Sequence, residues 1–292
     1  MGALAMAEAN GLVSLELRAP NNIAAWHIVD DQQLRLATVR AGLDLARKLG
    51  QREWMISLGS HGMDAAFLVG EWDWALAVFA ELDQGDVPLE TRPLILQAAL
   101  IKAYRGSLTA ESSRVTKIEA TMGSMTNPQW ASLLPANQAS IAFAAGDLEA
   151  SYRFAMRSVS TARGDLTASA VAYSAAAQAA LWLRDRERAG EAVHALDSIP
   201  LKGARLDATR KQFRAGLLAL DGRGEDALAA YAEAARRFRD RDLHYCLGIC
   251  QLELTMLLGA DHPQARAAAD EAREIFTRLD SPPMLERLKT AH

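Results

Sequence analysis

The chain of 292 residues is half hydrophobic and 23% charged, which is the balance of a soluble globular protein. Its net charge of −4 offers no basic footprint for nucleic acid or anionic lipid, and charges interrupt every apolar stretch short of the roughly 20 residues that span a bilayer. The N-terminus lacks the basic region of a secretory signal, so we expect a cytoplasmic protein that contacts neither nucleic acid nor membrane.

The first helices are expected over residues 3–18 and 31–49, and two aspartates, Asp30 and Asp31, stand at the start of the second. Such a carboxylate pair binds magnesium in some all-α terpenoid enzymes, but the fuller Asp-Asp-x-x-Asp pattern is missing. We therefore expect these aspartates to begin the helix, where negative charge lies at its positive end.

The next pair of helices is expected at 53–69 and 73–83. The first contains Gly59-Ser60-His61-Gly62, which looks catalytic but lacks the strand-turn-helix context that a nucleophile elbow needs. Near the start of the second, Trp72 fits a packed aromatic position. Trp74 faces another direction and is either a partly covered surface residue or an anchor for a partner.

Further pairs are expected at 90–105/109–121 and 128–145/147–162. Asn127-Pro128 has the form of an N-cap followed by proline at the first helical position. Pro135 falls inside the predicted helix 128–145, and it should either kink that helix or delay its start.

The last pairs are expected at 166–183/185–197, 203–221/224–240 and 243–258/262–279, and Asp280-Ser281-Pro282-Pro283 separates them from a short helix near 283–290. The basic run 236–241 lies near a helix C-terminus, where cations complement the dipole. Cys246 and Cys250 are four apart on one helix, which disfavours a disulfide and indicates reduced thiols. With His244 they would give three ligands where structural zinc needs four, so packing in the core is favoured.

A turn pattern recurs through these pairs: a small or turn residue, an acidic or polar pair, then alanine opening a helix. The copies begin at Gly70, Gly106, Gly146, Arg184, Gly222 and Ala260, with separations of 36, 40, 38, 38 and 38 residues. The residues seven positions before these starts are Met63, Ala99, Ala139, Ala177, Ala215 and Glu253. Alanine is expected where paired helices approach closely, so Glu253 fits this rule badly and leaves the register of the last pair open.

The sequences Gly70-Glu71-Trp72-Asp73-Trp74-Ala75-Leu76, with Phe79, and Ala227-Leu228-Ala229-Ala230-Tyr231, with Ala234, resemble the second helix of a tetratricopeptide motif. The period is nearer 38 than 34, and the aromatic signatures of the first helix are mostly missing, so the array is divergent. We predict an all-α, right-handed α–α superhelix, a tetratricopeptide-like solenoid of about six to seven helix pairs that forms a single domain over 1–292.

The last part of the chain, with Leu257-Leu258-Gly259 and the segment from Ala272 to Pro283, is similar to the C-terminal repeat region of large bacterial signalling proteins. Those proteins combine a nucleotide cyclase or a helix-turn-helix (LuxR-type) DNA-binding domain with an NTPase module and a tetratricopeptide-like tail. The resemblance implies a regulatory tail. Their activities do not carry over, because the catalytic residues lie in domains that this sequence does not contain.

No catalytic motif supports an enzyme. The sequence contains no Gly-x4-Gly-Lys-(Ser/Thr) loop, no His-Glu-x-x-His and no Gly-x-Ser-x-Gly. We therefore expect a non-catalytic protein without a cofactor or metal.

In tetratricopeptide stacks the first helix of each pair lines the concave surface. That register places there Ser57, Ser60, Asp64, Leu96, Ser140, Ser174, Gln178, Gln212 and Gly216. Small and amide side chains leave room and offer donors and acceptors. The leading hypothesis is a regulatory scaffold that binds a protein, a peptide or other domains of a longer parent chain. The alternative is a sensor that binds a small molecule or peptide in the groove and changes its curvature.

Overall fold

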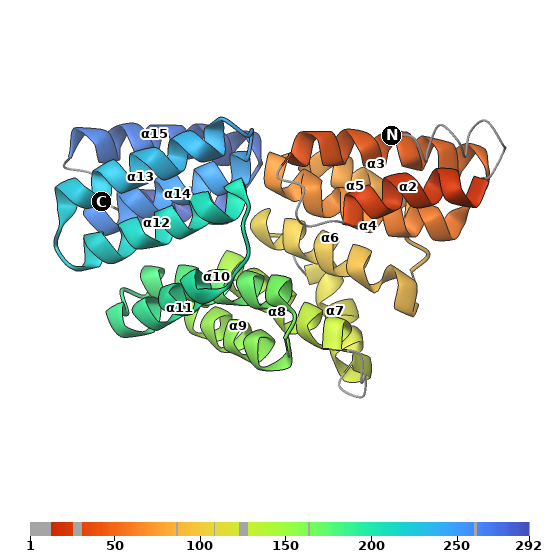
Figure 1. Ribbon diagram of the computed structural model, residues 1–292, viewed down its shortest axis with the longest axis horizontal. Coiled ribbons are helices and arrows are strands. Elements are labelled where there is room, and N and C mark those ends of the chain that lie inside the picture. The colour runs from red at the N-terminus through yellow and green to blue at the C-terminus, as the bar shows by residue number, and fades with distance from the viewer. Residues whose placement is uncertain are drawn as a thin grey trace. The chain divides into compact units, whose positions relative to one another are not determined.

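The computed structural model describes residues 13–25, 31–85, 87–107, 109–122, 128–162, 164–259 and 262–291. Within these ranges every regular element is a helix (Figure 1), which confirms the predicted all-α class. The chain divides into two compact units, 1–98 and 99–292, and the boundary falls within one continuous helix, Arg92–Tyr104. The prediction of a single domain over 1–292 stays a prediction.

The first unit is built from helices packed on their neighbours. It contains α2 (Val13–Ala25), α3 (Gln32–Lys48), α4 (Arg52–Val69), α5 (Trp72–Leu82), the 3₁₀ helix η1 (Leu89–Thr91) and the start of α6 (Arg92–Tyr104). Helix α4 contacts α2, α3 and α5, and it carries more buried residues than α3 or α5.

Helix α2 extends past the predicted end at residue 18, so that boundary is wrong; residues 3–12 lie outside the described part. The helix continues to Ala25 because one of its faces is buried against the neighbouring helices. Leu17 and Ala24 are fully buried, and Pro20 between them is buried against Gly42 of α3. This packing maintains the helix although proline removes one backbone hydrogen bond.

The other local predictions for this unit agree with the structure. Asp31 caps α3 and accepts the N–H of Leu34 at 2.8 Å, while Asp30 lies outside the described residues. The segment 59–62 lies within α4. Trp72 is buried, stacks on Phe67 with ring centroids 5.5 Å apart and donates its indole N–H to the Phe67 carbonyl at 3.0 Å.

The second unit consists of helix pairs that follow one another along the chain (Figure 1). Its helices after α6 are α7 (Thr109–Met122), α8 (Pro128–Ala145), α9 (Leu148–Ala162), α10 (Leu166–Trp182), α11 (Arg186–Ser198), α12 (Ala204–Leu220), α13 (Gly224–Arg239), α14 (His244–Leu258), α15 (Pro263–Arg278) and α16 (Pro282–Thr290). Each of these bounds lies within three residues of the prediction. Helix α8 begins at Pro128 and continues through Pro135, so the delayed start does not occur; Asn127 is outside the described residues.

The predicted repeat appears directly in the backbone. The residue at each of the first five predicted starts has a left-handed φ: Gly70, Gly106, Gly146, Arg184 and Gly222. The sixth start, residue 260, is outside the described part, and Gly259 before it has φ +79°. The residues seven positions before the starts, Glu253 included, are all fully buried. The recurring turn therefore marks the end of the first helix of each pair.

Gly222 and Gly224 provide a matched test of this turn. A Cβ at either position would meet no atom within 4 Å, but Gly222 alone of the two has a left-handed φ, +74°. We expect Gly222→Ala to lower the free energy of unfolding by about 1 kcal/mol, because an L side chain is strained in that conformation. Gly224→Ala should leave it unchanged or slightly raised. Chemical denaturation measures both, and equal effects would contradict the assignment of strain to the turn.

No helix in the described ranges is sufficiently long and apolar to cross a bilayer.

Candidate ligand-binding face

The first helices of the pairs in the second unit form a continuous inner layer. Helix α10 contacts α8, α12 and α14, and α12 contacts α14. The second helices α9, α11 and α13 each pack between consecutive first helices along the chain, and α15 packs between α14 and α16. This arrangement agrees with the predicted register, in which the first helices share one surface.

A buried carboxylate joins this inner layer. Glu253 of α14 is fully buried, and its two oxygens accept hydrogen bonds from four uncharged donors on three other helices. The donors are Gln178 Nε2 and Trp182 Nε1 (3.0 Å) to Oε2, and Gln212 Nε2 (3.3 Å) and Tyr231 OH (3.0 Å) to Oε1. We call these five residues the Glu253 cluster. Gln212 also donates to Gln178 Oε1 at 3.2 Å, so the two amides lie side by side.

The electrostatics of the Glu253 cluster favour the protonated acid more than is usual. Burial raises the pKa of Glu253 to about 7, although the four hydrogen bonds lower it from what burial alone would give. No arginine, lysine or histidine forms a hydrogen bond or ion pair with this carboxylate in the described part of the chain. Glu253 is therefore poised to change its charge near neutral pH.

Helical spacing and small residues position the donors. Gln178 and Trp182 are four apart on α10 and share one face of that helix. A Cβ at Gly216 of α12 would lie 2.8 Å from Leu181 and 3.2 Å from the Tyr231 hydroxyl. Any larger residue at position 216 would displace Leu181 or the tyrosine that reaches Glu253.

The C-terminal helix covers one end of the inner layer. Helix α16 contacts α8 as well as α14 and α15. The Arg287 guanidinium lies over the rings of Phe143 (5.2 Å) and Trp182 (5.1 Å), and donates to the backbone carbonyls of Phe143 and Ala144 at the C-terminus of α8. Ser281 fixes the start of α16 by donating its hydroxyl to the Tyr104 carbonyl at 2.6 Å.

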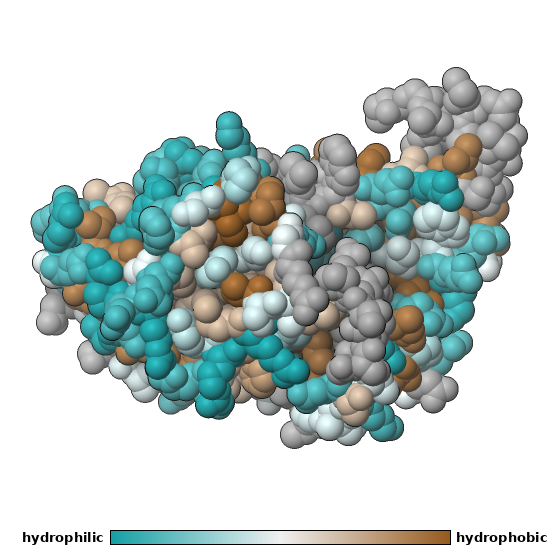
Figure 2. Space-filling model, turned by 60° about the horizontal axis from the view of Figure 1, so that its bottom comes forward, coloured by the Kyte–Doolittle hydropathy of each residue, from teal (hydrophilic) through white to brown (hydrophobic). Residues whose placement is uncertain are grey.

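The half of the inner layer formed by the N-terminal ends of α10 and α12, away from α16, is more open. Thr167, Val171, Ser174 and Gln178 follow one face of α10, and the exposed fraction of Val171 is 47%. Arg205 and Thr209 occupy the corresponding face of α12 ahead of Gln212, and both are half-buried. Figure 2 shows one side of the molecule, on which apolar residues form small patches among hydrophilic ones. The open half is therefore a mixed surface that carries apolar, hydroxyl and charged side chains.

Of the residues predicted to line the concave face in the second unit, the structure brings Gln178 and Gln212 together in the Glu253 cluster. Ser140 and Ser174 donate to carbonyls of their own helices, Ala136 and Ala170. Whether these four residues contact a ligand stays a prediction.

The predicted residues of the first unit have local partners. Ser57 donates to Asn21 Oδ1 at 2.7 Å and Ser60 to the Ile56 carbonyl at 2.9 Å. Asp64 forms an ion pair with Arg35 at 2.7 Å. Leu96 is fully buried and does not line a surface.

Trp74 is partly covered. The Arg40 guanidinium lies 5.0 Å from the centroid of its ring, and a Cβ at Gly62 would be 2.7 Å from it. Glycine at position 62 therefore makes room for the ring. A role for Trp74 as an anchor for a partner stays a prediction.

Sequence reasoning did not assign Glu253, Trp182, Tyr231 or Arg287 to a site. The signal for Glu253 was present, because it is an acid at a position where four other repeats have alanine. Tyr231 was recognised only as part of the tetratricopeptide-like pattern, and Trp182 and Arg287 carry no local pattern that would reveal them.

The two cysteines behave as core residues. Both thiols are free, Cys250 is fully buried, and burial raises the pKa of Cys246 to about 11. In the described ranges no group of three or more histidine, cysteine, aspartate or glutamate residues is arranged to hold a metal ion.

Comparison with known proteins relates this chain to others through structure. No protein-family model and no curated sequence matches it. Among solved structures it is similar to a Rap protein complexed with competence and sporulation factor, with a TM-score of 0.62 and 10% sequence identity over 94% of this chain and 80% of that chain. At that identity the likeness shows the fold, which is an all-α, tetratricopeptide-like helical-repeat solenoid.

Proposed function

We propose that this chain is a non-catalytic scaffold that binds a protein or peptide segment on the open half of the inner layer in the second unit. The observation that carries the proposal is the exposed face of α10, where Val171 is 47% accessible between Thr167 and Ser174. An apolar side chain flanked by hydroxyl groups suits a peptide, which offers both apolar side chains and backbone hydrogen-bonding groups.

The Glu253 cluster supports this proposal because it joins the floor of that surface. Hydrogen bonds to one carboxylate link α10, α12, α13 and α14, so the helices that flank the open half are held in a fixed arrangement. A rigid surface loses little conformational entropy when it binds a flexible segment. The Rap protein of similar fold was crystallised with a competence and sporulation factor, which is a precedent for a bound factor on this architecture.

Peptide selection tests the proposal. Peptides that bind the purified protein are selected from a displayed library, and their affinities are measured by calorimetry. We expect Val171→Asp to weaken binding about tenfold, because the charge must be desolvated in the contact. Met156→Asp on the second helix α9, where the side chain is 36% exposed, is the matched control and should bind normally. Equal affinities for the two variants would rule out α10 as the binding face.

A sensor of small molecules or peptides is the second candidate, because the Glu253 cluster couples several helices to one buried group. A ligand that separated Gln178 from Gln212 would alter the angle between α10 and α12. Native mass spectrometry separates the two candidates: a retained small molecule supports the sensor, and its absence supports the scaffold.

As part of the same proposal, we infer that the chain is the cytoplasmic tail of a bacterial signalling protein. The reading frame upstream of Met1 tests it, since a cyclase or NTPase domain in frame would support it and a stop codon would oppose it.

A further inference from the structure

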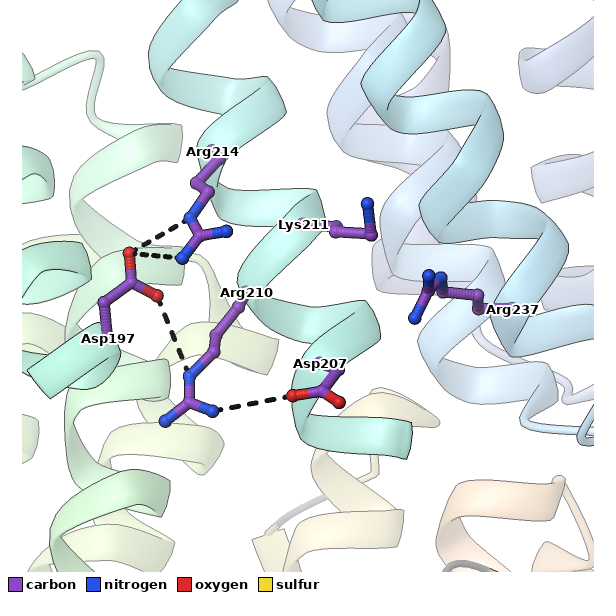
Figure 3. A pocket seen from close by; sticks show the side chains of 6 residues that line it. All are labelled: Asp197, Asp207, Arg210, Lys211, Arg214 and Arg237. Atoms are coloured by element: carbon purple, nitrogen blue, oxygen red, sulfur yellow. Dashed lines mark hydrogen bonds and ion pairs between the residues drawn. The ribbon is translucent and has the colours of Figure 1, made fainter. Parts of the chain in front are cut away.

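An open pocket of about 310 Å³ lies among α11, α12 and α13, and charged side chains line it. The lining residues are Asp197, Asp207, Arg210, Lys211, Arg214 and Arg237 (Figure 3). They comprise four cations and two carboxylates, so the lining has a formal charge of +2, from 4 − 2. The pocket therefore offers positive potential in a chain whose net charge is −4.

Two of the four cations, Arg210 and Arg214, already form hydrogen bonds with other groups of the protein. The Arg210 guanidinium donates to the carbonyls of Leu196 (2.9 Å), Ile199 (2.8 Å) and Leu201 (2.9 Å), where α11 ends. Arg214 Nε donates to Asp197 Oδ2 at 3.0 Å. These contacts fix one wall of the pocket and largely neutralise Asp197.

The other two cations face one another across the pocket and have unused donors. In Figure 3, Lys211 of α12 and Arg237 of α13 point toward each other. Lys211 makes no hydrogen bond or ion pair with any described residue. Arg237 uses its Nε for Glu233 at 2.8 Å, and Glu233 is shared with Arg236 at 2.9 Å. The charges of Lys211 and Arg237 are therefore only partly compensated.

The lining is also incompletely bonded. Arg210 Nε and Asp197 Oδ1 are both buried, lie 3.7 Å apart and have no hydrogen-bond partner among the described residues. The two atoms form an ion pair with each other at this distance, which keeps Arg210 and Asp197 in place as a fixed wall of the pocket.

We propose that this pocket binds a phosphate group, with Lys211 and Arg237 as its direct partners. A guanidinium presents two parallel N–H donors that match a phosphate, and an ammonium adds a compact charge. Asp207, one turn before Lys211, opposes an anion, so the affinity is modest. The site lies outside the open half of the inner layer and is independent of the proposed partner-binding function.

Phosphate titration tests the proposal. Melting temperature and calorimetric heat are followed as inorganic phosphate is added, with ionic strength kept constant by sodium chloride. We expect saturable stabilisation with a dissociation constant in the millimolar range. O-phosphoserine serves as a second ligand: tighter binding than inorganic phosphate indicates a phosphate carried by a protein, and weaker binding indicates a free one.

Variants locate the site. Lys211→Ala combined with Arg237→Ala should weaken phosphate binding about tenfold or more, because charge-assisted hydrogen bonds are lost. Lys211→Arg retains the charge and should bind normally, and so should Arg241→Ala, which removes an exposed cation outside the pocket. A non-saturating response, or equal responses of the double variant and Arg241→Ala, would show general screening and overturn the proposal. Circular dichroism of each variant confirms that it is folded.

Discussion

Raising the pH from 5 to 8 is expected to lower the free energy of unfolding by about 3 kcal/mol through Glu253 alone. Burial raises the pKa of this carboxyl in the folded protein from 4.5 to about 7. Between these two values the folded state binds more protons than the unfolded state, so stability falls as the pH rises. The contribution is complete below about pH 4.5 and is lost above about pH 7. Urea denaturation at a series of pH values measures it.

Glu253→Gln isolates this contribution from the rest of the protein. Glutamine is isosteric with the protonated acid and does not titrate, so the variant should show no corresponding loss between pH 5 and 8. It should match the natural protein at pH 5 and exceed its stability at pH 8 by up to about 3 kcal/mol. Parallel pH curves for the two proteins would mean that Glu253 stays ionised throughout this range.

Other carboxylates act in the opposite sense and at lower pH. Hydrogen bonds from arginines lower the pKa of Glu81, Asp221 and Glu233. Their stabilising effect is present above their unfolded pKa values and is lost as the pH falls through the folded ones. Because they make stability rise with pH, they cannot produce a fall between pH 5 and 8.

The fold was predictable because its determinants are local and repeated. Left-handed residues at 70, 106, 146, 184 and 222 recur with a nearly constant spacing, and alanine stands seven positions before the last four of them. Hydrophobic periodicity then located the helices between them. A repeat array buries its apolar faces against neighbours in sequence, so little long-range information is needed.

The Glu253 cluster was not predictable for the opposite reason. Its donors come from α10, α13 and α12, up to 75 residues from Glu253, and they meet only when the inner layer is assembled. The sequence marked Glu253 as an exception to the alanine rule but could not show what replaces the lost close packing. Likewise, the concave register brought Gln178 and Gln212 to one place without revealing that a carboxylate already bonds to both.

Asp64 illustrates the same difficulty in the first unit and leads to a second large effect. It was predicted to face a ligand, but it accepts a hydrogen bond from Arg35 Nη1 at 2.7 Å. Arg35 is 1% exposed and also donates to the Ala24 carbonyl at 2.7 Å and to Gln32 Oε1 at 3.2 Å. One buried guanidinium thus joins the end of α2 to α3 and α4.

Arg35→Ala is expected to lower the free energy of unfolding of the first unit by about 3 kcal/mol. The substitution opens a cavity, leaves the Ala24 carbonyl without this donor and removes the cation beside Asp64. The side chain of Asp64 is 36% exposed, so water partly compensates, which places the effect at the low end of the range for broken buried pairs. Denaturation measures the loss, and amide hydrogen exchange should assign it to α2, α3 and α4.

Arg40→Ala, on the same helix, is the matched control. Its ion pair with Glu71 is exposed on both sides, at 44% and 51%, and its guanidinium lies over Trp74. Exposed pairs contribute little, so we expect a loss below about 1 kcal/mol. If Arg35→Ala cost no more than Arg40→Ala, the buried guanidinium would not join these helices, and Asp64 would remain a candidate for the partner-binding role predicted from the concave register. A loss three times larger would instead assign Asp64 to the scaffold and leave the open half of the inner layer in the second unit as the surface for partners.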